Sequence, residues 1–380
     1  MRTLLSRIFP LLFICLVSCS NPKTSQSELS INKKPVIIAY VGGFRGLIDP
    51  AEISAKKITH INYAFVDVVD GKAFLTNEVT DTVNFRKLNL LKKDNPDLKI
   101  MISIGGWTWS RNFSDAVLTE DGREMFARSA VDIMHSHGLD GVDIDWEYPA
   151  LPGDTGNIYR PEDKQNYTLM FKEIRENLDS LEKVTSKKYL LTTATGGFEK
   201  FIQSTEMDKA QQYLDFVNIM TYDYFPEKQA AHHTNLYNSD RYQPERSADS
   251  IVHSYVKAGV PLEKLVMGIA FYGRSFEVID GSQNGLGDEV VKQTQGRGYT
   301  FIKDSLVGRG GYERYFDEKA KAPYLFNKEQ KVFVTYDDEE SVKYKCEYVL
   351  NRGMGGVMFW EYSSDQKEYL LDEINKTFHQ

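Results

Sequence analysis

The chain has 380 residues, of which 41% are hydrophobic, and a formal net charge of −8 at pH 7. This length allows two average domains or one large α/β barrel. The acidic balance and the lack of a Lys- or Arg-rich run argue against a nucleic-acid partner and are typical of a soluble globular protein. Aromatic residues reach 12%, which indicates a use for flat apolar surfaces.

The N-terminus has the pattern of an export signal. Two arginines precede an apolar run at 8–17, which is too short to span a membrane, and small residues follow. "LVSC" (16–19) resembles a bacterial lipobox, which implies cleavage before Cys19 and lipidation of that cysteine. We favour this over an ordinary cleavage site because a polar tether follows. We therefore expect a signal peptide at 1–18, a tether at 19–34 and a catalytic barrel at 35–380, exported and anchored by lipid in a bacterial membrane.

Cysteine usage agrees with this arrangement. Cys15 would leave with the signal peptide and Cys19 would carry lipid, so Cys346 would remain alone. No intramolecular disulfide is expected despite export. Ser20 is compatible with sorting of the lipoprotein to an outer membrane, and we expect a monomer.

Eight short apolar, β-branched runs recur between longer polar or amphipathic stretches and predict strands. They lie at 35–40, 58–65, 98–105, 139–146, 189–195, 214–222, 264–273 and 355–362. Helical patterns fill several gaps, for example at 122–138 and 163–183. In the second, five apolar residues from Tyr167 to Leu178 share one helix face. Eight strand–helix units predict an α/β fold, the closed (β/α)8 TIM barrel.

The gap between the seventh and eighth predicted strands is too long for one helix. Residues 276–336 are rich in Gly and Tyr and contain two strand-like pieces, "GYTFI" (298–302) and "KVFVTY" (331–336). We interpret this stretch as a small inserted α+β subdomain. The helix before the eighth strand is then 338–353, ending on Gly353 as a cap.

"LDGVDIDWEY" (139–148) places acids along the fourth predicted strand. Residues two apart share a strand face at a rise of roughly 3.3 Å per residue, so Asp143, Asp145 and Glu147 point the same way, about 6–7 Å apart. The apolar residues between them point towards the helices, and the acids therefore face the barrel interior. Glu147 lies at its C-terminal mouth, where active sites of this fold are built. Asp140 faces away and is expected to be structural, at a turn.

Stacked carboxylates without a cationic partner are too costly to be structural. Neighbouring like charges raise one another's pKa, which suits a general acid that keeps its proton near neutral pH. Carboxylic acids on a barrel rim amid aromatic residues point to glycoside hydrolysis. The histidines show no spacing suited to zinc, and we expect no metal or cofactor.

The segment "LDGVDIDWE" resembles the D-x-x-D-x-D-x-E motif of glycoside hydrolase family 18, the chitinases. Four further segments resemble family motifs in the same order: "SIGGW" (103–107), "MTYD" (220–223), "YGRSF" (272–276) and "GGVMFWEYSSD" (355–365). The resemblance covers almost all of the mature chain. The resemblance implies a retaining mechanism in which the acetamido oxygen of the substrate is the nucleophile and an oxazolinium ion forms.

In that mechanism Glu147 would protonate the leaving oxygen and later deprotonate the incoming water. Asp145 would orient the acetamido N–H and share a proton with Asp143. Tyr222 would bond the acetamido carbonyl. The resemblance also implies a sugar-binding cleft with Trp360 as its floor, lined by Tyr40, Phe65, Gly106, Trp107, Met220, Asp223, Tyr272, Arg274 and Trp360.

Three functions fit this reading. The first is a chitinase that cleaves β-1,4-linked N-acetylglucosamine polymers or oligomers. The second is an endo-β-N-acetylglucosaminidase acting on N-glycans, which the predicted insertion disfavours. The third is a lectin on the same barrel that binds chitin oligomers without cleaving them, which the complete set of acids disfavours.

Overall fold

The computed structural model describes residues 34–226, 228–243 and 246–379. The chain divides into residues 1–33 and 34–380. The predicted signal peptide and lipidation site at Cys19, and the tether up to residue 33, lie outside the described residues. Within the described part, no helix has the length and apolar character needed to cross a bilayer.

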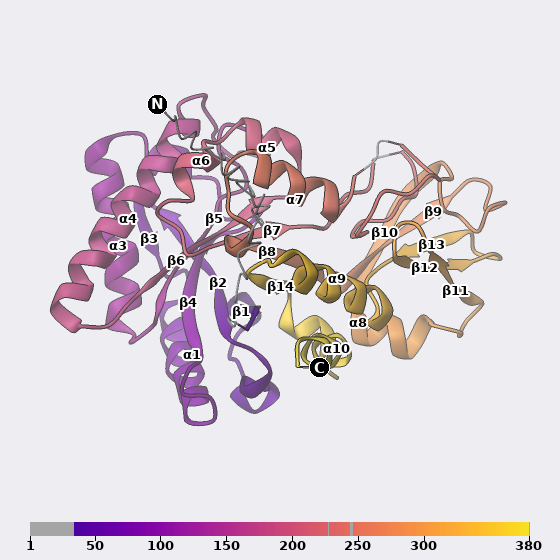
Figure 1. Ribbon diagram of the computed structural model, residues 1–380, viewed down its shortest axis with the longest axis horizontal. Coiled ribbons are helices and arrows are strands. Elements are labelled where there is room, and N and C mark those ends of the chain that lie inside the picture. The colour runs from indigo at the N-terminus through magenta and orange to yellow at the C-terminus, as the bar shows by residue number, and fades with distance from the viewer. Residues whose placement is uncertain (1–33, 227, 244–245, 380) are drawn as a thin grey trace, which may run out of the picture. The chain divides into compact units, whose positions relative to one another are not determined.

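Eight parallel strands form a closed barrel, which confirms the predicted (β/α)8 architecture (Figure 1). The strands are β1 (Val36–Gly42), β2 (His60–Val69), β4 (Lys99–Gly105), β5 (Gly141–Asp145), β6 (Leu190–Gly196), β7 (Phe216–Met220), β8 (Leu265–Ala270) and β14 (Gly356–Trp360). Their order is β1-β14-β8-β7-β6-β5-β4-β2, and pairing of β1 with β2 closes the ring. A short strand, β3 (Lys72–Phe74), extends β2 as an antiparallel hairpin. Each predicted barrel strand is present, with ends that differ by up to four residues.

Helices follow most strands and cover the outside of the barrel. The α-helices are α1 (Glu78–Leu90), α2 (Phe113–Ala116), α3 (Glu120–Ser136), α4 (Asp163–Thr185), α5 (Glu199–Gln203), α6 (Met207–Ala210), α7 (Ala248–Lys257), α8 (Tyr299–Phe301), α9 (Glu339–Arg352) and α10 (Tyr369–Phe378). Single turns η1 to η7 lie at Gly43–Arg45, Pro50–Glu52, Ala55–Lys57, Leu91–Lys93, Leu262–Lys264, Ile302–Leu306 and Tyr362–Asp365. The predicted apolar face of α4 is buried. Gly353 ends α9 in the left-handed conformation, with φ of 70°.

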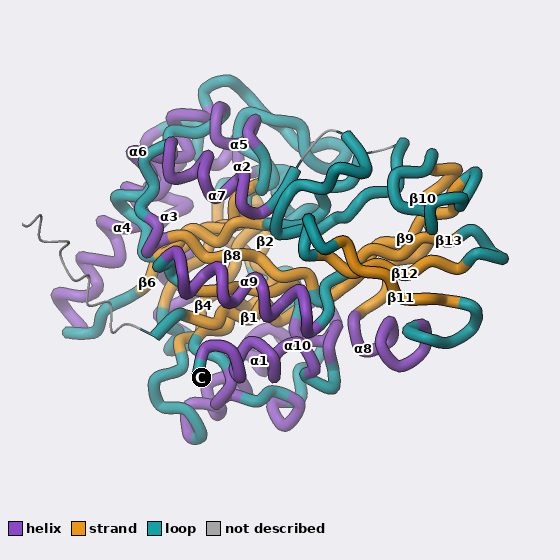
Figure 2. The backbone as a smooth tube through the Cα atoms, turned by 45° about the vertical axis from the view of Figure 1, so that its right-hand side comes forward, coloured by secondary structure: helices purple, strands orange, loops and turns teal. Residues whose placement is uncertain are grey.

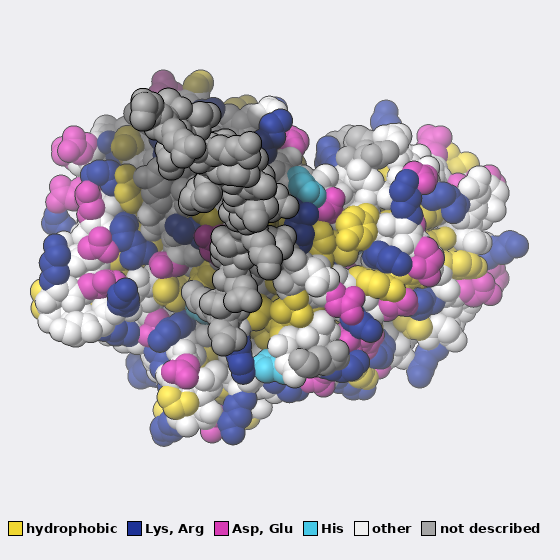
Figure 3. All heavy atoms as spheres, in the orientation of Figure 1, with side chains coloured by type: hydrophobic (Ala, Val, Ile, Leu, Met, Phe, Trp, Pro, Cys, Tyr) yellow, Lys and Arg dark blue, Asp and Glu magenta, His cyan; other side chains and the backbone are white. Residues whose placement is uncertain are grey.

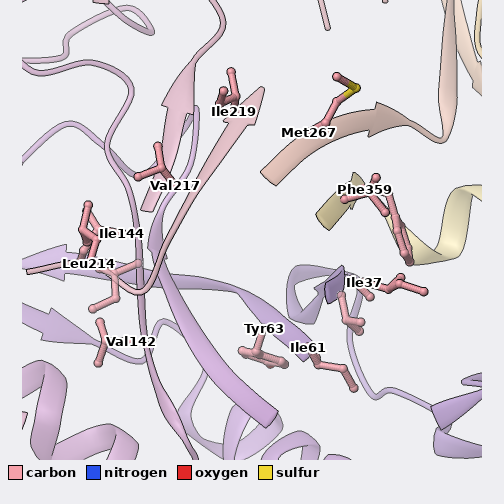
Figure 4. Packing of buried hydrophobic residues seen from close by; sticks show 14 of the residues in the cluster. Ile37, Ile61, Tyr63, Val142, Ile144, Leu214, Val217, Ile219, Met267 and Phe359 are labelled. Atoms are coloured by element: carbon pink, nitrogen blue, oxygen red, sulfur yellow. The ribbon is translucent and has the colours of Figure 1, made fainter. Parts of the chain in front are cut away.

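Alternation along the strands separates two interiors. Val142, Ile144 and Trp146 belong to the large apolar core between strands and helices, part of which is shown in Figure 4. The residues between them, Asp143 and Asp145, face the inside of the barrel, whose floor is a smaller apolar cluster that includes Tyr40 and Met358. The period of two along β5 therefore places the acids where the sequence predicts them.

Five further strands form a second, antiparallel sheet after β8 (Figure 2). They are β9 (Tyr272–Val278), β10 (Val290–Gly298), β11 (Tyr312–Asp317), β12 (Ala322–Asn327) and β13 (Val332–Thr335), in the order β10-β9-β13-β12-β11. The sheet begins at Tyr272, four residues before the predicted start of the insertion. Because β9 starts two residues after β8 ends, it carries Tyr272 and Arg274 past the mouth of the barrel.

One prediction in this region is wrong. "GYTFI" is not a strand: α8 and the turn at Ile302–Leu306 occupy it, after β10 ends at Gly298. Tyr299 and Ile302, three residues apart, are both buried, while Phe301 is 44% exposed. This spacing of buried residues is helical rather than alternating. The other predicted piece, "KVFVTY", is confirmed as β13.

Asp140 is structural as predicted, but it does not cap a turn. Its carboxylate, placed just before β5, accepts a hydrogen bond from the Ile100 backbone N–H at 2.8 Å and pairs with Lys92 at 2.6 Å and Lys187 at 2.8 Å. Elsewhere, on the face shown in Figure 3, acidic and basic side chains are intermingled over the described surface.

Candidate active site

A cavity of about 1400 Å³ opens at the C-terminal ends of the barrel strands. Its walls contain eleven of the thirteen predicted catalytic and binding residues. They are Tyr40, Phe65, Trp107, Asp145, Glu147, Met220, Tyr222, Asp223, Tyr272, Arg274 and Trp360. Asp143 and Gly106 are not part of the lining. The fold therefore brings together side chains from β1, β2, β4, β5, β7, β9 and β14.

Asp143 lies fully buried and takes part in a dense hydrogen-bond network. Its Oδ2 accepts from the Tyr40 hydroxyl at 2.9 Å and from Ser103 Oγ at 2.8 Å. Its Oδ1 accepts from Thr192 Oγ1 at 2.6 Å and from Asn218 Nδ2 at 3.3 Å. Burial raises the pKa of Asp143, and these donors oppose the rise. The Asp143 carboxylate is thus fixed in place from four sides.

Asp145 lacks the hydrogen-bond network that surrounds Asp143. It is 4% exposed, and its Oδ1 has no hydrogen-bond partner among the described residues. Burial, followed by the charges of Glu147 and Asp143, raises the pKa of Asp145 well above its ordinary value. Asp145 also lines the cavity, so its carboxyl group can form a hydrogen bond with a ligand bound there. The sharing of a proton between Asp145 and Asp143 stays a prediction.

Glu147 follows β5 and is held through its backbone. Its N–H donates to Ser110 Oγ at 2.9 Å, and its carbonyl accepts from Asn157 Nδ2 at 2.9 Å. Burial raises the pKa of the side chain to about 7, hydrogen bonding with Tyr148 lowers it and the negative charge of Asp223 raises it. A carboxyl group that keeps its proton near neutral pH can act as a general acid.

Asp223 follows β7 and is kept ionised. Arg274 donates to both of its oxygens, Nε to Oδ1 at 2.8 Å and Nη2 to Oδ2 at 2.7 Å, and the Tyr272 hydroxyl donates to Oδ2 at 3.0 Å. The His233 ring approaches Oδ1 at 3.4 Å. Burial alone would raise the pKa of Asp223, but His233 and Arg274 outweigh it and hold this pKa well below its ordinary value. The cavity therefore contains a fixed anion beside the acid.

The aromatic side chains that line the cavity form two groups of packed rings, one around Trp360 and one around Tyr148. The Trp360 ring lies nearly parallel to Phe65, with centroids 5.4 Å apart at 19°, and to Phe44, 6.3 Å apart at 21°. Tyr40 tilts against the same indole. Trp107 is 50% exposed and meets Tyr148 edge to face. Apolar rings of this kind pack against the C–H faces of sugar rings.

Gly106 contributes backbone rather than a contact surface. It has φ of 82°, and a Cβ there would lie 2.6 Å from the Phe65 ring. Its N–H donates to the Asp145 carbonyl at 2.7 Å. The left-handed conformation and the close ring together favour glycine at this position.

Several lining residues were not predicted as site residues. They are Phe44, Tyr148, Phe198, Glu199, Lys200, Tyr224, Phe225, Arg246 and Gln293, among others. Two of them have a signal in the sequence that could have marked them as site residues. Tyr148 directly follows Glu147, and Phe44 directly follows two glycines. Gln293 comes from β10 in the second sheet, and no local pattern marks it. Among the described residues, no group of three or more His, Cys, Asp or Glu could hold a metal ion.

The sequence model described as "Glycosyl hydrolases family 18" matches residues 36–365. The chain therefore belongs to family 18 of the glycosyl hydrolases, and it is a glycoside hydrolase.

Among characterised relatives, chitinase A1 of Niallia circulans is 38% identical over 85% of this chain and 55% of its own length. The chain thus spans about half of that relative. Chitinase B of Serratia marcescens is 33% identical over 87% of this chain and 78% of its own. Among solved structures, a family 18 N-acetylglucosaminidase from Paenibacillus barengoltzii is 40% identical, with a TM-score of 0.84, and covers 90% of this chain and 99% of its own.

Proposed function

We propose that the protein is an exported chitinase that hydrolyses β-1,4 bonds between N-acetylglucosamine units of chitin or chitooligosaccharides. The observation that carries the proposal is the pair Asp145 and Glu147, which both line the cavity: one Asp145 oxygen has no hydrogen-bond partner among the described residues, and the neighbouring acid has a pKa of about 7. Relatives named as chitinases support the substrate class.

The proposed chemistry proceeds in two steps with retention. Glu147 donates its proton to the glycosidic oxygen as the C–O bond breaks, while the substrate's acetamido oxygen attacks the anomeric carbon and forms an oxazolinium ion. Water then attacks that carbon, Glu147 takes up a proton from the water, and the ring reopens to the acetamide. Substrate assistance replaces the carboxylate nucleophile of ordinary retaining glycosidases.

Asp145 orients and stabilises the acetamido group. As positive charge develops on that group, the nearby carboxylate gains interaction energy in the transition state that it lacks in the ground state. Tyr222 donates to the acetamido oxygen in this proposal; its hydroxyl makes one hydrogen bond within the described part of the chain, to the sulfur of Met358 at 3.9 Å, which supports this role. Trp360 is the floor for the sugar ring, and Asp223 contacts the sugar or the acetamido group.

The second sheet supports the chitinase reading over an N-glycan endoglycosidase. It contributes Tyr272, Arg274 and Gln293 to the wall of the cavity, and in this proposal the segment inserted after β8 deepens the cleft. The relative named as an N-acetylglucosaminidase makes release of single sugars a further product pattern to examine. A lectin would bind the same oligomers without turnover.

Export and anchoring by lipid on Cys19, in an outer membrane, complete the proposal. Cys19→Ala should leave the barrel active and move it from the membrane fraction to the soluble fraction. A variant that still fractionates with membranes would rule out lipid on Cys19 as the anchor.

The decisive experiment follows chitohexaose by mass spectrometry with the chain lacking residues 1–19, beside Glu147→Gln and Glu339→Gln. Glu339, on α9, pairs with Lys303 and does not line the cavity. Cleavage by the wild type and by Glu339→Gln, with binding but no turnover in Glu147→Gln, is the expected result. Tight binding without products in every protein would indicate a lectin. Neither binding nor products would redirect the search to N-glycans.

A further inference from the structure

The turn that carries Tyr222 and Asp223 into the cleft has an unusual backbone. Asp223 has φ of 60°, in the left-handed region that residues with a Cβ adopt rarely. Both side chains emerge from this turn, directly after β7. Their positions in the cleft therefore depend on whatever holds the turn from behind.

Two hydrogen bonds from neighbouring residues bracket the turn. The Tyr224 N–H donates to the His233 carbonyl at 3.1 Å on one side of the Tyr222–Asp223 pair. Thr234 Oγ1 lies 3.2 Å from the Thr221 carbonyl on the other side. A two-residue segment thus braces both ends of the turn.

A buried ion pair fixes Thr234. Lys345 Nζ on α9 donates to Thr234 Oγ1 at 2.7 Å and to Asp337 Oδ2 at 2.6 Å. The Lys345 and Asp337 side chains are 0% and 1% exposed. Asp337 also accepts from the Ala270 N–H at 3.3 Å, at the end of β8. The pair therefore connects α9 to the ends of both β7 and β8.

The ammonium group determines how Thr234 bonds. Because Lys345 can only donate, Thr234 Oγ1 must accept from it. The single hydroxyl proton of Thr234 is then directed to the Thr221 carbonyl or to Asp337 Oδ2, which lies 3.0 Å away. Loss of the ammonium would free the hydroxyl to rotate, and the brace behind Tyr222 would loosen.

Stability alone gives a weak reason for this arrangement. Replacing a buried ion pair by neutral groups of similar volume is often neutral or even stabilising. The Lys345–Asp337 pair bonds to groups at the ends of β7 and β8, next to residues that line the cleft. A role in holding the backbone there in one conformation explains the pair better than a gain in stability.

We propose that Lys345, acting with Asp337 through Thr234, is a positioning residue that holds the Tyr222–Asp223 turn in its working geometry. It touches neither substrate nor reacting atoms. The expected fall in kcat rests on the proposed function. The expected shift of the Tyr222–Asp223 backbone does not depend on it.

The most direct test is Thr234→Val, which removes the hydroxyl, keeps the volume and leaves the ion pair in place. The expected result is a fall in kcat of about tenfold or more on chitohexaose, with KM close to wild type and a modest fall in Tm, because the Thr221 carbonyl and Lys345 each lose a hydrogen-bond partner. A wild-type kcat in this variant would overturn the proposal.

Two further variants separate position from stability. Lys345→Met should lower both Tm and kcat because it leaves Asp337 buried and unpaired. Lys345→Met combined with Asp337→Asn should recover Tm while kcat stays low. Recovery of both quantities would mean that the pair is structural only. The control Lys57→Met removes a pair with Glu368 far along the chain from the turn and should leave kcat unchanged.

A crystal structure of the Thr234→Val variant gives a readout that needs no substrate. A shifted Tyr222–Asp223 backbone, with the Lys57→Met backbone unshifted, supports the brace; an unmoved turn contradicts it. If the wild type fails to cleave chitooligosaccharides, the proposed function fails, and these structures still decide the positioning role.

Discussion

Asp143 and Asp145 lie two residues apart on the same face of β5, yet only the first is saturated with hydrogen bonds. Four donors surround Asp143, whereas Asp145 Oδ1 has none among the described residues. In a buried site, an unmet acceptor costs free energy unless a ligand satisfies it. The contrast assigns the internal, fixed position to Asp143 and the ligand-facing one to Asp145.

Asp145→Asn should therefore reduce kcat by about 100-fold to 1000-fold, the scale seen when a group that stabilises developing charge is removed. Affinity for an uncleaved oligomer should change little, because the carboxylate acts mainly as the oxazolinium ion forms. Steady-state kinetics on chitotetraose would measure kcat, and isothermal titration calorimetry with an oligomer that is not cleaved would measure the affinity. Asp140→Asn is the matched control from the same segment. A wild-type rate in Asp145→Asn would mean that the acetamido group is not the nucleophile.

The raised pKa of Glu147 predicts an alkaline limit to activity. Because the proposed acid must hold a proton, kcat/KM should fall about tenfold per pH unit above a pKa of about 7. A pH–rate profile between pH 4 and pH 9 would locate the limb. An alkaline limb near pH 4.5, the ordinary value for glutamate, would contradict the burial of this acid.

The same group predicts how stability depends on pH. Folding raises the pKa of Glu147 from 4.5 to about 7, so its contribution is fully present below pH 4.5 and is lost as pH rises through 7. Ionisation of Glu147 therefore costs the folded state free energy. Glu147→Gln should thus be more stable than the wild type at pH 8 and equal to it at pH 4, by thermal denaturation at both pH values. A variant less stable than the wild type at pH 8 would contradict the prediction.

Arg274 should matter through Asp223. Arg274→Leu removes two hydrogen bonds and a positive charge, so the pKa of Asp223 should rise and protonation should begin at higher pH. We expect kcat/KM to fall roughly 10-fold to 100-fold, as for loss of one partner of a partly buried charge pair, and the acidic limb of the profile to move upwards. Arg297→Leu, on β10 and packed on Phe301, is the control. If the acidic limb is unchanged in Arg274→Leu, protonation of Asp223 does not cause the loss of kcat/KM at low pH.

The sequence predicted the barrel and the inward acids because both depend on local periodicity. The strands are short β-branched runs, and the period of two along 141–145 determines which side chains face inside. The failure at "GYTFI" has the same origin, since five residues of mixed apolar character do not distinguish a strand from a helical turn. Tertiary burial of Tyr299 and Ile302 decided the outcome.

Long-range relations could not be derived in this way. Gln293 reaches the cavity only because β10 pairs with β9, and the Lys345–Thr234 contact joins residues 111 positions apart. The four donors to Asp143 come from four different strands. Such contacts depend on the closure of the barrel and leave no pattern within a window of ten or twenty residues.

Asp140 lies in the same segment as the proposed catalytic acids, and its substitution tests whether its role is only structural. Its carboxylate is 5% exposed and pairs with Lys92 and Lys187, and although burial would raise its pKa, the two lysines hold that pKa below its ordinary value. The contribution to stability is therefore present above pH 3.8 and is lost as pH falls through the lowered pKa. Asp140→Asn should destabilise the protein by about 1–3 kcal/mol at pH 6, leave kcat unchanged, and show a smaller loss of stability at pH 3. Chemical denaturation at both pH values, with kinetics at pH 6, would measure these quantities. A large loss of kcat in a folded Asp140→Asn protein would contradict a purely structural role for Asp140 and would group it with the catalytic acids Asp143, Asp145 and Glu147.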